Sequence, residues 1–93
     1  MKILITCPGL SPHGGIRVIL EWANRLQDLG HKVTLLCKEK ECSWFNIRVP
    51  VCQNVLFNAF DCLIVTSPHH VELLNQPKPL KKFVFMQMLE HLF

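Results

Sequence analysis

The sequence lacks the patterns that identify several common classes of small protein. It has no Cys-x-x-Cys pair, and its five cysteines are an odd number, which argues against a disulfide framework and against a zinc knuckle. No stretch approaches the roughly twenty apolar residues of a transmembrane helix. The run KILIT before Cys7 has only five residues, too few for the core of a signal peptide. We therefore expect a soluble chain, and reduced cysteines favour a cytoplasmic location.

The sequence also lacks a large excess of positive or negative charge. The chain of 93 residues has 10 basic and 7 acidic side chains, and its net charge is +3. The only basic run, Lys78 with Lys81 and Lys82, contains no aromatic residue. Proteins that bind nucleic acids present basic patches, often with aromatic side chains between them. Nucleic acid is therefore not expected as a partner.

A pattern of strand, glycine-rich turn, helix and strand opens the chain. KILIT (2–6) is a short apolar run that ends before Pro8 and Gly9, and KVTLLC (32–37) is a second one. The residues between them follow a helical period over 16–29, with Gly30 as the stop. The expected apolar face comprises Ile16, Ile19, Leu20, Ala23 and Leu26, widened by Val18, Trp22 and Leu29. This βαβ unit predicts a parallel sheet with a right-handed crossover.

The rest of the chain continues the same alternation. Residues 47–49 predict a weak third strand that Pro50 ends, and residues 54–60 a short helix or turn. CLIVTS (62–67) predicts a buried strand, Pro68 opens a helix to about Asn75, and 83–87 is the last strand. The expected fold is an α/β domain over residues 1–93, with an open parallel sheet of Rossmann-like type that is incomplete.

The glycine-rich turn is the candidate binding element. In CPGLSPHGGIRVIL (7–20), Gly14 and Gly15 stand directly before the helix. Without a Cβ they let a ligand approach the backbone closely, and a helix N-terminus favours an anion such as phosphate. In the alternative interpretation the glycines only shape the turn. The dinucleotide fingerprint and the Walker A pattern are both absent, although Glu39 could accept a ribose hydroxyl.

Three segments in order carry a family resemblance. GGIRVILEWANRLQDLGHKVTLLC resembles the opening of the N-terminal domain of family 4 glycosyltransferases, with Gly14-Gly15, then 22–26 (WANRL), then 30–34 (GHKVT). FDCLIVTSPHHVELL resembles a later strand and loop of that family, and KKFVFMQMLEHLF resembles the next strand and its exit loop. The resemblance covers nearly the whole chain.

The resemblance implies a B-type fold of two Rossmann-like halves with catalysis between them. It implies transfer of a sugar from a nucleotide-sugar donor to a glycan, lipid or other acceptor with retention, without a cofactor or a metal. The half that holds the nucleotide is not among these residues, so 1–93 is expected to be part of the N-terminal, acceptor-side domain and to be inactive alone. Peripheral membrane association is possible only through the full-length protein.

The resemblance also suggests site residues. Gly14 and Gly15 would approach the donor diphosphate, and Arg17 one turn later would add positive charge, unless it pairs with Glu21 on the solvent face. No catalytic residue is assigned.

Candidates for the acceptor or sugar pocket follow the strands. His13 stands beside the glycine pair, and His69 and His70 follow the strand 62–67. Gln87 occupies a position where many members have a histidine; it can bond a sugar hydroxyl but cannot titrate. Glu90 is the acidic candidate after that strand.

Two other functions stay open at the level of sequence. The chain could be the cofactor-binding module of an oxidoreductase, in which case Glu39 matters and NADH should bind. It could also be a non-catalytic α/β interaction domain that keeps the fold without the second half.

Overall fold

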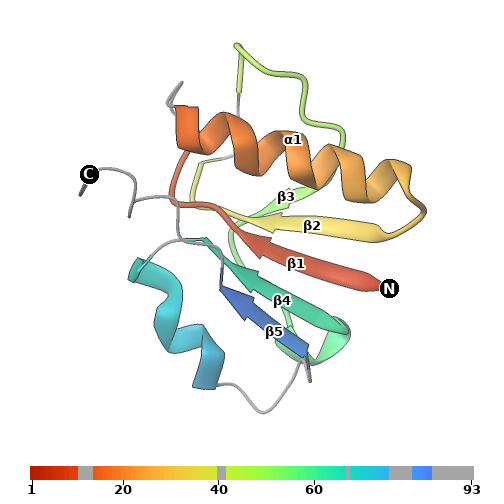
Figure 1. Cartoon of the computed structure of the whole chain (residues 1–93). Helices are drawn as coiled ribbons and strands as arrows, with labels where there is room; N and C mark the ends of the chain where they lie inside the picture. Colours follow the sequence, from red (N-terminus) through yellow and green to blue (C-terminus); the bar gives the residue numbers. More distant parts are fainter. Residues whose placement is uncertain (11–13, 40–41, 67, 76–80, 85–93) are drawn as a thin grey trace.

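A computed structural model describes residues 1–10, 14–39, 42–66, 68–75 and 81–84 (Figure 1). The elements in chain order are β1 (Lys2–Thr6), α1 (Gly14–Asp28), β2 (Lys32–Leu36), β3 (Val51–Cys52), the 3₁₀ helix η1 (Phe57–Ala59), β4 (Cys62–Val65), the 3₁₀ helix η2 (Pro68–Asn75) and β5 (Lys81–Val84).

The five strands form one sheet in the order β3-β2-β1-β4-β5, and every neighbouring pair is parallel. In the register, Ile3 of β1 lies between Val33 of β2 and Cys62 of β4. The sequence prediction of an α/β fold with an open parallel sheet is thus confirmed. The arrangement is consistent with an incomplete Rossmann-like sheet.

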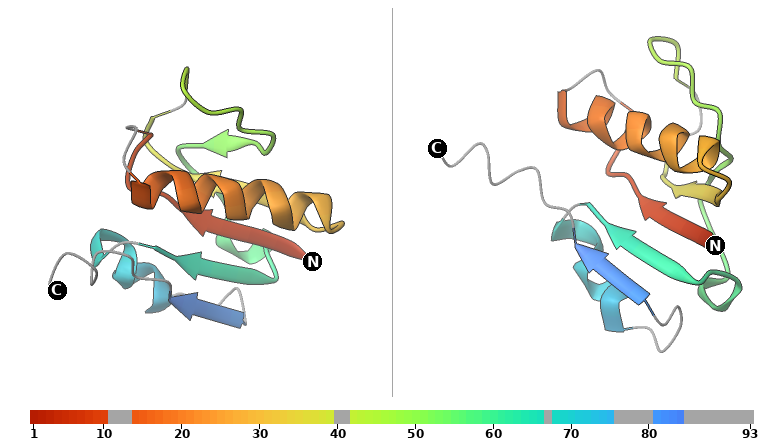
Figure 2. Two further views of the ribbon diagram at one scale, coloured as in Figure 1. Left: turned by 45° about the horizontal axis from the view of Figure 1, so that its top comes forward. Right: turned by 45° about the vertical axis from the view of Figure 1, so that its right-hand side comes forward.

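Helix α1 lies on one face of the sheet and η2 on the other (Figures 1 and 2). The helical period explains how α1 packs on the sheet, because its buried apolar residues are Ile16, Ile19, Leu20 and Ala23. The predicted widening of this face is wrong at two positions. Trp22 and Leu29 are 48% and 73% exposed, and Leu29 lies beyond the last residue of α1.

The helix ends where the sequence predicts. Gly30 has a φ of 99°, a conformation that side chains with a Cβ adopt only with strain. Its N–H donates to the carbonyl of Gln27 at 3.1 Å, and the N–H of His31 donates to the carbonyl of Leu26 at 3.2 Å. These bonds satisfy the last helix carbonyls and turn the chain into β2.

Two hydrophobic layers enclose the sheet. Between α1 and the sheet lie buried residues of β1, β2 and α1, together with Cys7, Cys37 and Cys62. On the opposite face, Leu4, Leu63 and Val65 contact half-buried side chains that include Leu73 and Leu74 of η2. Alternate residues of β1 therefore serve different layers, which explains why this strand is apolar along nearly its whole length.

Several predicted elements differ in the structure. Residues 47–49 are not a strand; the third strand is β3, after Pro50, because the N–H of Arg48 donates to the Asn24 side chain at 2.9 Å instead of to the sheet. The helix from Pro68 is present, but as a 3₁₀ helix. The last strand begins at Lys81 and is described to Val84, so residues 85–87 of the prediction lie outside the described part.

Candidate functional site

The carboxyl ends of the strands and the start of α1 lie at the same edge of the sheet (Figure 1). The chain leaves β1 for α1 on one face, whereas it leaves the neighbouring strand β4 for η2 on the other face. The topological switch point is therefore between β1 and β4. Open α/β sheets bind ligands in the crevice outside this point, because the loops diverge there.

Two threonines join the strands at the switch point. The N–H of Thr66 donates to Oγ1 of Thr6 at 3.1 Å, and the Thr66 hydroxyl donates to the Thr6 carbonyl at 2.5 Å. Both residues are buried, at 0% and 5% exposure. These bonds extend the contact of β1 with β4 beyond its last registered pair, Ile5 with Ile64. Sequence reasoning missed this pair, since neither threonine stands in a motif.

Three hydrogen bonds to side chains hold the loop after β1. The Cys7 thiol donates to the Gly9 carbonyl at 3.0 Å. The N–H of Leu10 donates to Oε2 of Glu39 at 3.3 Å, and the Trp44 indole N–H donates to the Leu10 carbonyl at 2.7 Å. Both backbone polar groups of Leu10 are thus bonded to side chains that come from other parts of the chain.

Gly9 permits the close approach of Glu39. A Cβ on Gly9 would lie 3.0 Å from Oε1 of Glu39, so a larger residue would displace the carboxylate. The sequence singled out Glu39 only as a possible ribose acceptor after the second strand. The structure adds that its carboxylate contacts the β1–α1 loop.

Two buried thiols stand beside this loop. Cys7 and Cys37 follow the paired strands β1 and β2 and belong to the core layer under α1. Burial raises the pKa of the Cys7 thiol to about 12 and also raises the pKa of Cys37. Both thiols are therefore neutral near pH 7. They act as small apolar residues here, and all five cysteines are free.

Of the predicted phosphate-binding residues, the two glycines lie at the expected edge of the sheet, whereas Arg17 forms an ion pair on the solvent face. Gly14 and Gly15 are not in a turn before the helix, as predicted, but are the first two residues of α1, at the edge that carries the switch point. Arg17 is engaged elsewhere, because its Nε lies 3.0 Å from Oε1 of Glu21 and its side chain is 66% exposed. In this structure Arg17 forms the solvent-face ion pair that the sequence offered as the alternative to a phosphate contact.

The pocket candidates are only partly placed. His69 and His70 lie in the first turn of η2, directly after the carboxyl end of β4. Their backbone is thus at the same edge as the glycine pair. His13, Gln87 and Glu90 lie outside the described residues.

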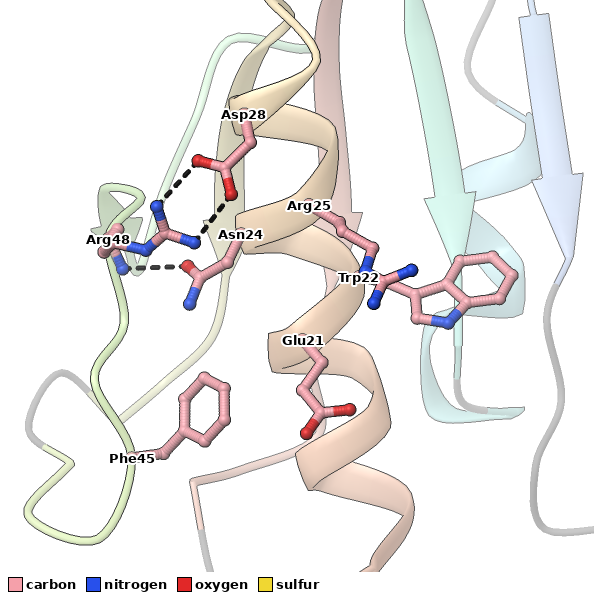
Figure 3. Close-up of a pocket in the computed structure, with 7 residues that line it drawn as sticks. All are labelled: Glu21, Trp22, Asn24, Arg25, Asp28, Phe45 and Arg48. Atoms are coloured by element: carbon pink, nitrogen blue, oxygen red, sulfur yellow. Dashed lines mark hydrogen bonds and ion pairs between the residues drawn. The ribbon is translucent and has the colours of Figure 1, made fainter.

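A separate hollow of about 540 Å³ lies between α1 and residues 45–48 (Figure 3). Asn24, which is 7% exposed, donates from Nδ2 to the Asn46 carbonyl at 2.9 Å and accepts the N–H of Arg48 at 2.9 Å. The Arg48 guanidinium donates two hydrogen bonds to the Asp28 carboxylate, at 2.6 and 2.9 Å.

This hollow has a structural explanation. Hydrogen bonding to the Arg48 guanidinium lowers the pKa of Asp28 and keeps it ionised. The polar groups of Asn24, Asp28 and Arg48 are used to tie residues 46–48 to the helix. The periodic pattern of α1 carried no signal for this clamp, because its partner residues lie in an irregular segment.

Comparison of the chain with protein-family models, with curated proteins and with solved structures finds no match. Among the residues that the structure describes, no group of three or more His, Cys, Asp and Glu side chains is placed to hold a metal ion. In the same part of the chain, no helix has the length and apolar character that crossing a membrane requires.

Proposed function

We propose that this chain is part of the N-terminal, acceptor-side domain of a retaining glycosyltransferase, in which the Gly14–Gly15 turn approaches the diphosphate of a nucleotide sugar. The observation that carries the proposal is the position of the glycine pair. It begins a 15-residue helix at the carboxyl edge of a parallel sheet, beside the switch point. That edge is where open α/β sheets bind ligands, and a helix start there offers N–H groups to an anion.

Glycine at the start of α1 would permit a ligand to approach the backbone closely. Among the described residues, Gly30 is the glycine with a positive φ, so backbone strain does not explain Gly15. A side chain at position 15 would instead add bulk next to the first turn of α1. The proposal therefore depends on what approaches the backbone there.

The chain would supply one part of the chemistry. Departure of a nucleoside diphosphate needs preorganised donors around the developing charge, in a site that excludes water. The glycine turn can contact the diphosphate from one side. A second α/β half would supply the nucleotide pocket, so we expect residues 1–93 alone to transfer no sugar. The acceptor would be a saccharide or a lipid-linked saccharide.

The pocket residues keep their proposed roles. His69 and His70 follow β4 at the same edge as the glycine pair, and on that ground they stay candidates for contacts with the acceptor or the donor sugar. His13, Gln87 and Glu90 are proposed on the resemblance alone.

The test compares two substitutions at one position in the full-length protein. Gly15→Val adds a branched side chain and is expected to lower kcat/KM with nucleotide sugars at least about tenfold. Gly15→Ala adds only a methyl group and favours the helix, so it should retain most of the activity. Circular dichroism checks that both variants fold. Full activity of the valine variant would show that the glycines only shape the turn.

A dinucleotide-binding module is the second candidate, because the Glu39 carboxylate lies beside Gly9 in the β1–α1 loop. In dinucleotide-binding folds an acidic residue after the second strand accepts a ribose hydroxyl. Titration of the chain with NADH separates the candidates. If the parent chain binds NADH and the Glu39→Ala variant does not, the oxidoreductase module is favoured. If neither the parent nor the variant binds NADH, the glycosyltransferase or an interaction domain is favoured.

A further inference from the structure

The Glu39 carboxylate accepts a hydrogen bond from a backbone N–H of the β1–α1 loop, which leads to Gly14 and Gly15. Its Oε2 accepts the N–H of Leu10 at 3.3 Å. Its Oε1 faces Gly9 so closely that an added Cβ would lie 3.0 Å away. Glu39 is an exposed residue, so water could solvate the carboxylate fully; it nevertheless lies against the loop.

The donor that Glu39 occupies is oriented by other contacts. The Trp44 indole holds the Leu10 carbonyl at 2.7 Å, and the Cys7 thiol holds the Gly9 carbonyl at 3.0 Å. The first of these carbonyls belongs to the next peptide group along the chain, and the second belongs to the same peptide group as the Leu10 N–H. The loop therefore presents a preorganised N–H, and a negatively charged group of the chain itself is bound to it.

Building on the proposed donor site, we propose that Glu39 is an internal competitor of the anionic ligand. Without ligand, its carboxylate holds the Leu10 N–H; a phosphate group binds at this loop by displacing it. Two unit charges of the same sign about 4 Å apart in water repel enough to change an affinity about fivefold, which is about 1 kcal/mol. The carboxylate therefore competes with a phosphate for the Leu10 N–H and lowers the affinity for small free anions about fivefold.

The experiment is an NMR titration of the ¹⁵N-labelled chain with inorganic pyrophosphate at constant ionic strength, following the amides of Leu10, Gly14 and Gly15. The test variant is Glu39→Gln, which removes the charge. Glu72→Gln is the matched control, because it makes the same charge change at an exposed residue of η2. Glu39→Asp keeps the charge on a side chain too short to hold the same bond.

We expect Glu39→Gln to bind pyrophosphate about fivefold more tightly than the parent chain, and Glu72→Gln to stay within about twofold of it. Glu39→Asp should lie between them, because its carboxylate remains nearby but releases the Leu10 N–H. If Glu39→Gln does not fold, the pyrophosphate affinity of Glu39→Asp is compared with that of the parent instead.

The outcomes separate this proposal from the proposed function. Shifts at Gly14 and Gly15 with equal affinity in the parent and both Glu39 variants would overturn the competition and support the anion site. An equal gain in Glu39→Gln and Glu72→Gln would also overturn it, because net charge would then explain the effect. If pyrophosphate moves neither glycine amide in any of the four chains, the donor site itself is refuted, and the competition with it.

Discussion

Truncation of Leu20 tests how α1 is seated on the sheet. Leu20 is 0% exposed and belongs to the core layer between α1 and the strands. A leucine-to-alanine change at such a site removes buried methyl groups and leaves a cavity, which lowers the free energy of unfolding by about 2–5 kcal/mol. A domain of this size has about 5–14 kcal/mol in total. The Leu20→Ala variant should therefore lose a large share of its stability.

Two other leucines, one in α1 and one directly after it, are matched controls for the same chemical change. Leu26 is half-buried against the same core layer, so its truncation should have about half the effect of Leu20→Ala. Leu29 is 73% exposed, and its truncation should change the stability by no more than about 0.5 kcal/mol. The order of the three losses follows the burial of the three side chains.

Urea unfolding measured by tryptophan fluorescence and circular dichroism gives the three values. Trp22 lies on α1 and Trp44 in the segment that contacts the β1–α1 loop, so both report on this face of the molecule. Unchanged m-values would show that the variants unfold between the same states. If the Leu20→Ala curve coincides with that of Leu29→Ala, the helix does not present this face to the sheet and the reasoning is refuted.

Three further predictions follow from individual contacts. The Arg48 guanidinium lowers the pKa of Asp28. Their ion pair therefore stabilises the fold at pH values above 3.8, the ordinary pKa of aspartate, and this contribution is lost as the pH falls through the lower pKa of the folded state. In an NMR titration, Arg48→Gln should raise the pKa of Asp28. Burial raises the pKa of Cys7 to about 12, so at pH 8 a thiol reagent should label half-buried Cys42 before Cys7 in peptide mass spectra, and the reverse order would contradict the burial. Asn24→Ala removes two hydrogen bonds to the backbone and should reduce the free energy of unfolding by about 1–3 kcal/mol in denaturant; an unchanged midpoint would show that residues 46–48 do not depend on it.

The strands and the long helix could be predicted from the sequence because their signals are local. Apolar runs such as 2–6 and 32–37 must be buried on both faces, which a parallel sheet achieves. The period of α1 repeats every 3.6 residues, and Gly30 marks its end. The glycine pair at the start of the helix was also visible, since residue type and position in the βαβ unit are both local information.

The positions that the sequence misjudged depend on contacts between distant segments. Residues 47–49 resemble a strand by composition, yet the side chain of Asn24, 24 residues away from Arg48, takes the N–H that a sheet would need. Trp22 and Leu29 are apolar, yet they are 48% and 73% exposed, and Leu29 lies beyond the end of α1.

The sequence by itself determined the class of fold, the phase of α1 and the glycine pair at its start, because periodicity and glycine act on neighbouring residues. The tertiary structure alone decided the candidate site around them. Thr66 meets Thr6 across 60 positions, and Glu39 meets Leu10 across 29. Such hydrogen bonds leave no periodic trace in the chain, since they form only when packing has brought the ends of β1, β2 and β4 to one edge of the sheet.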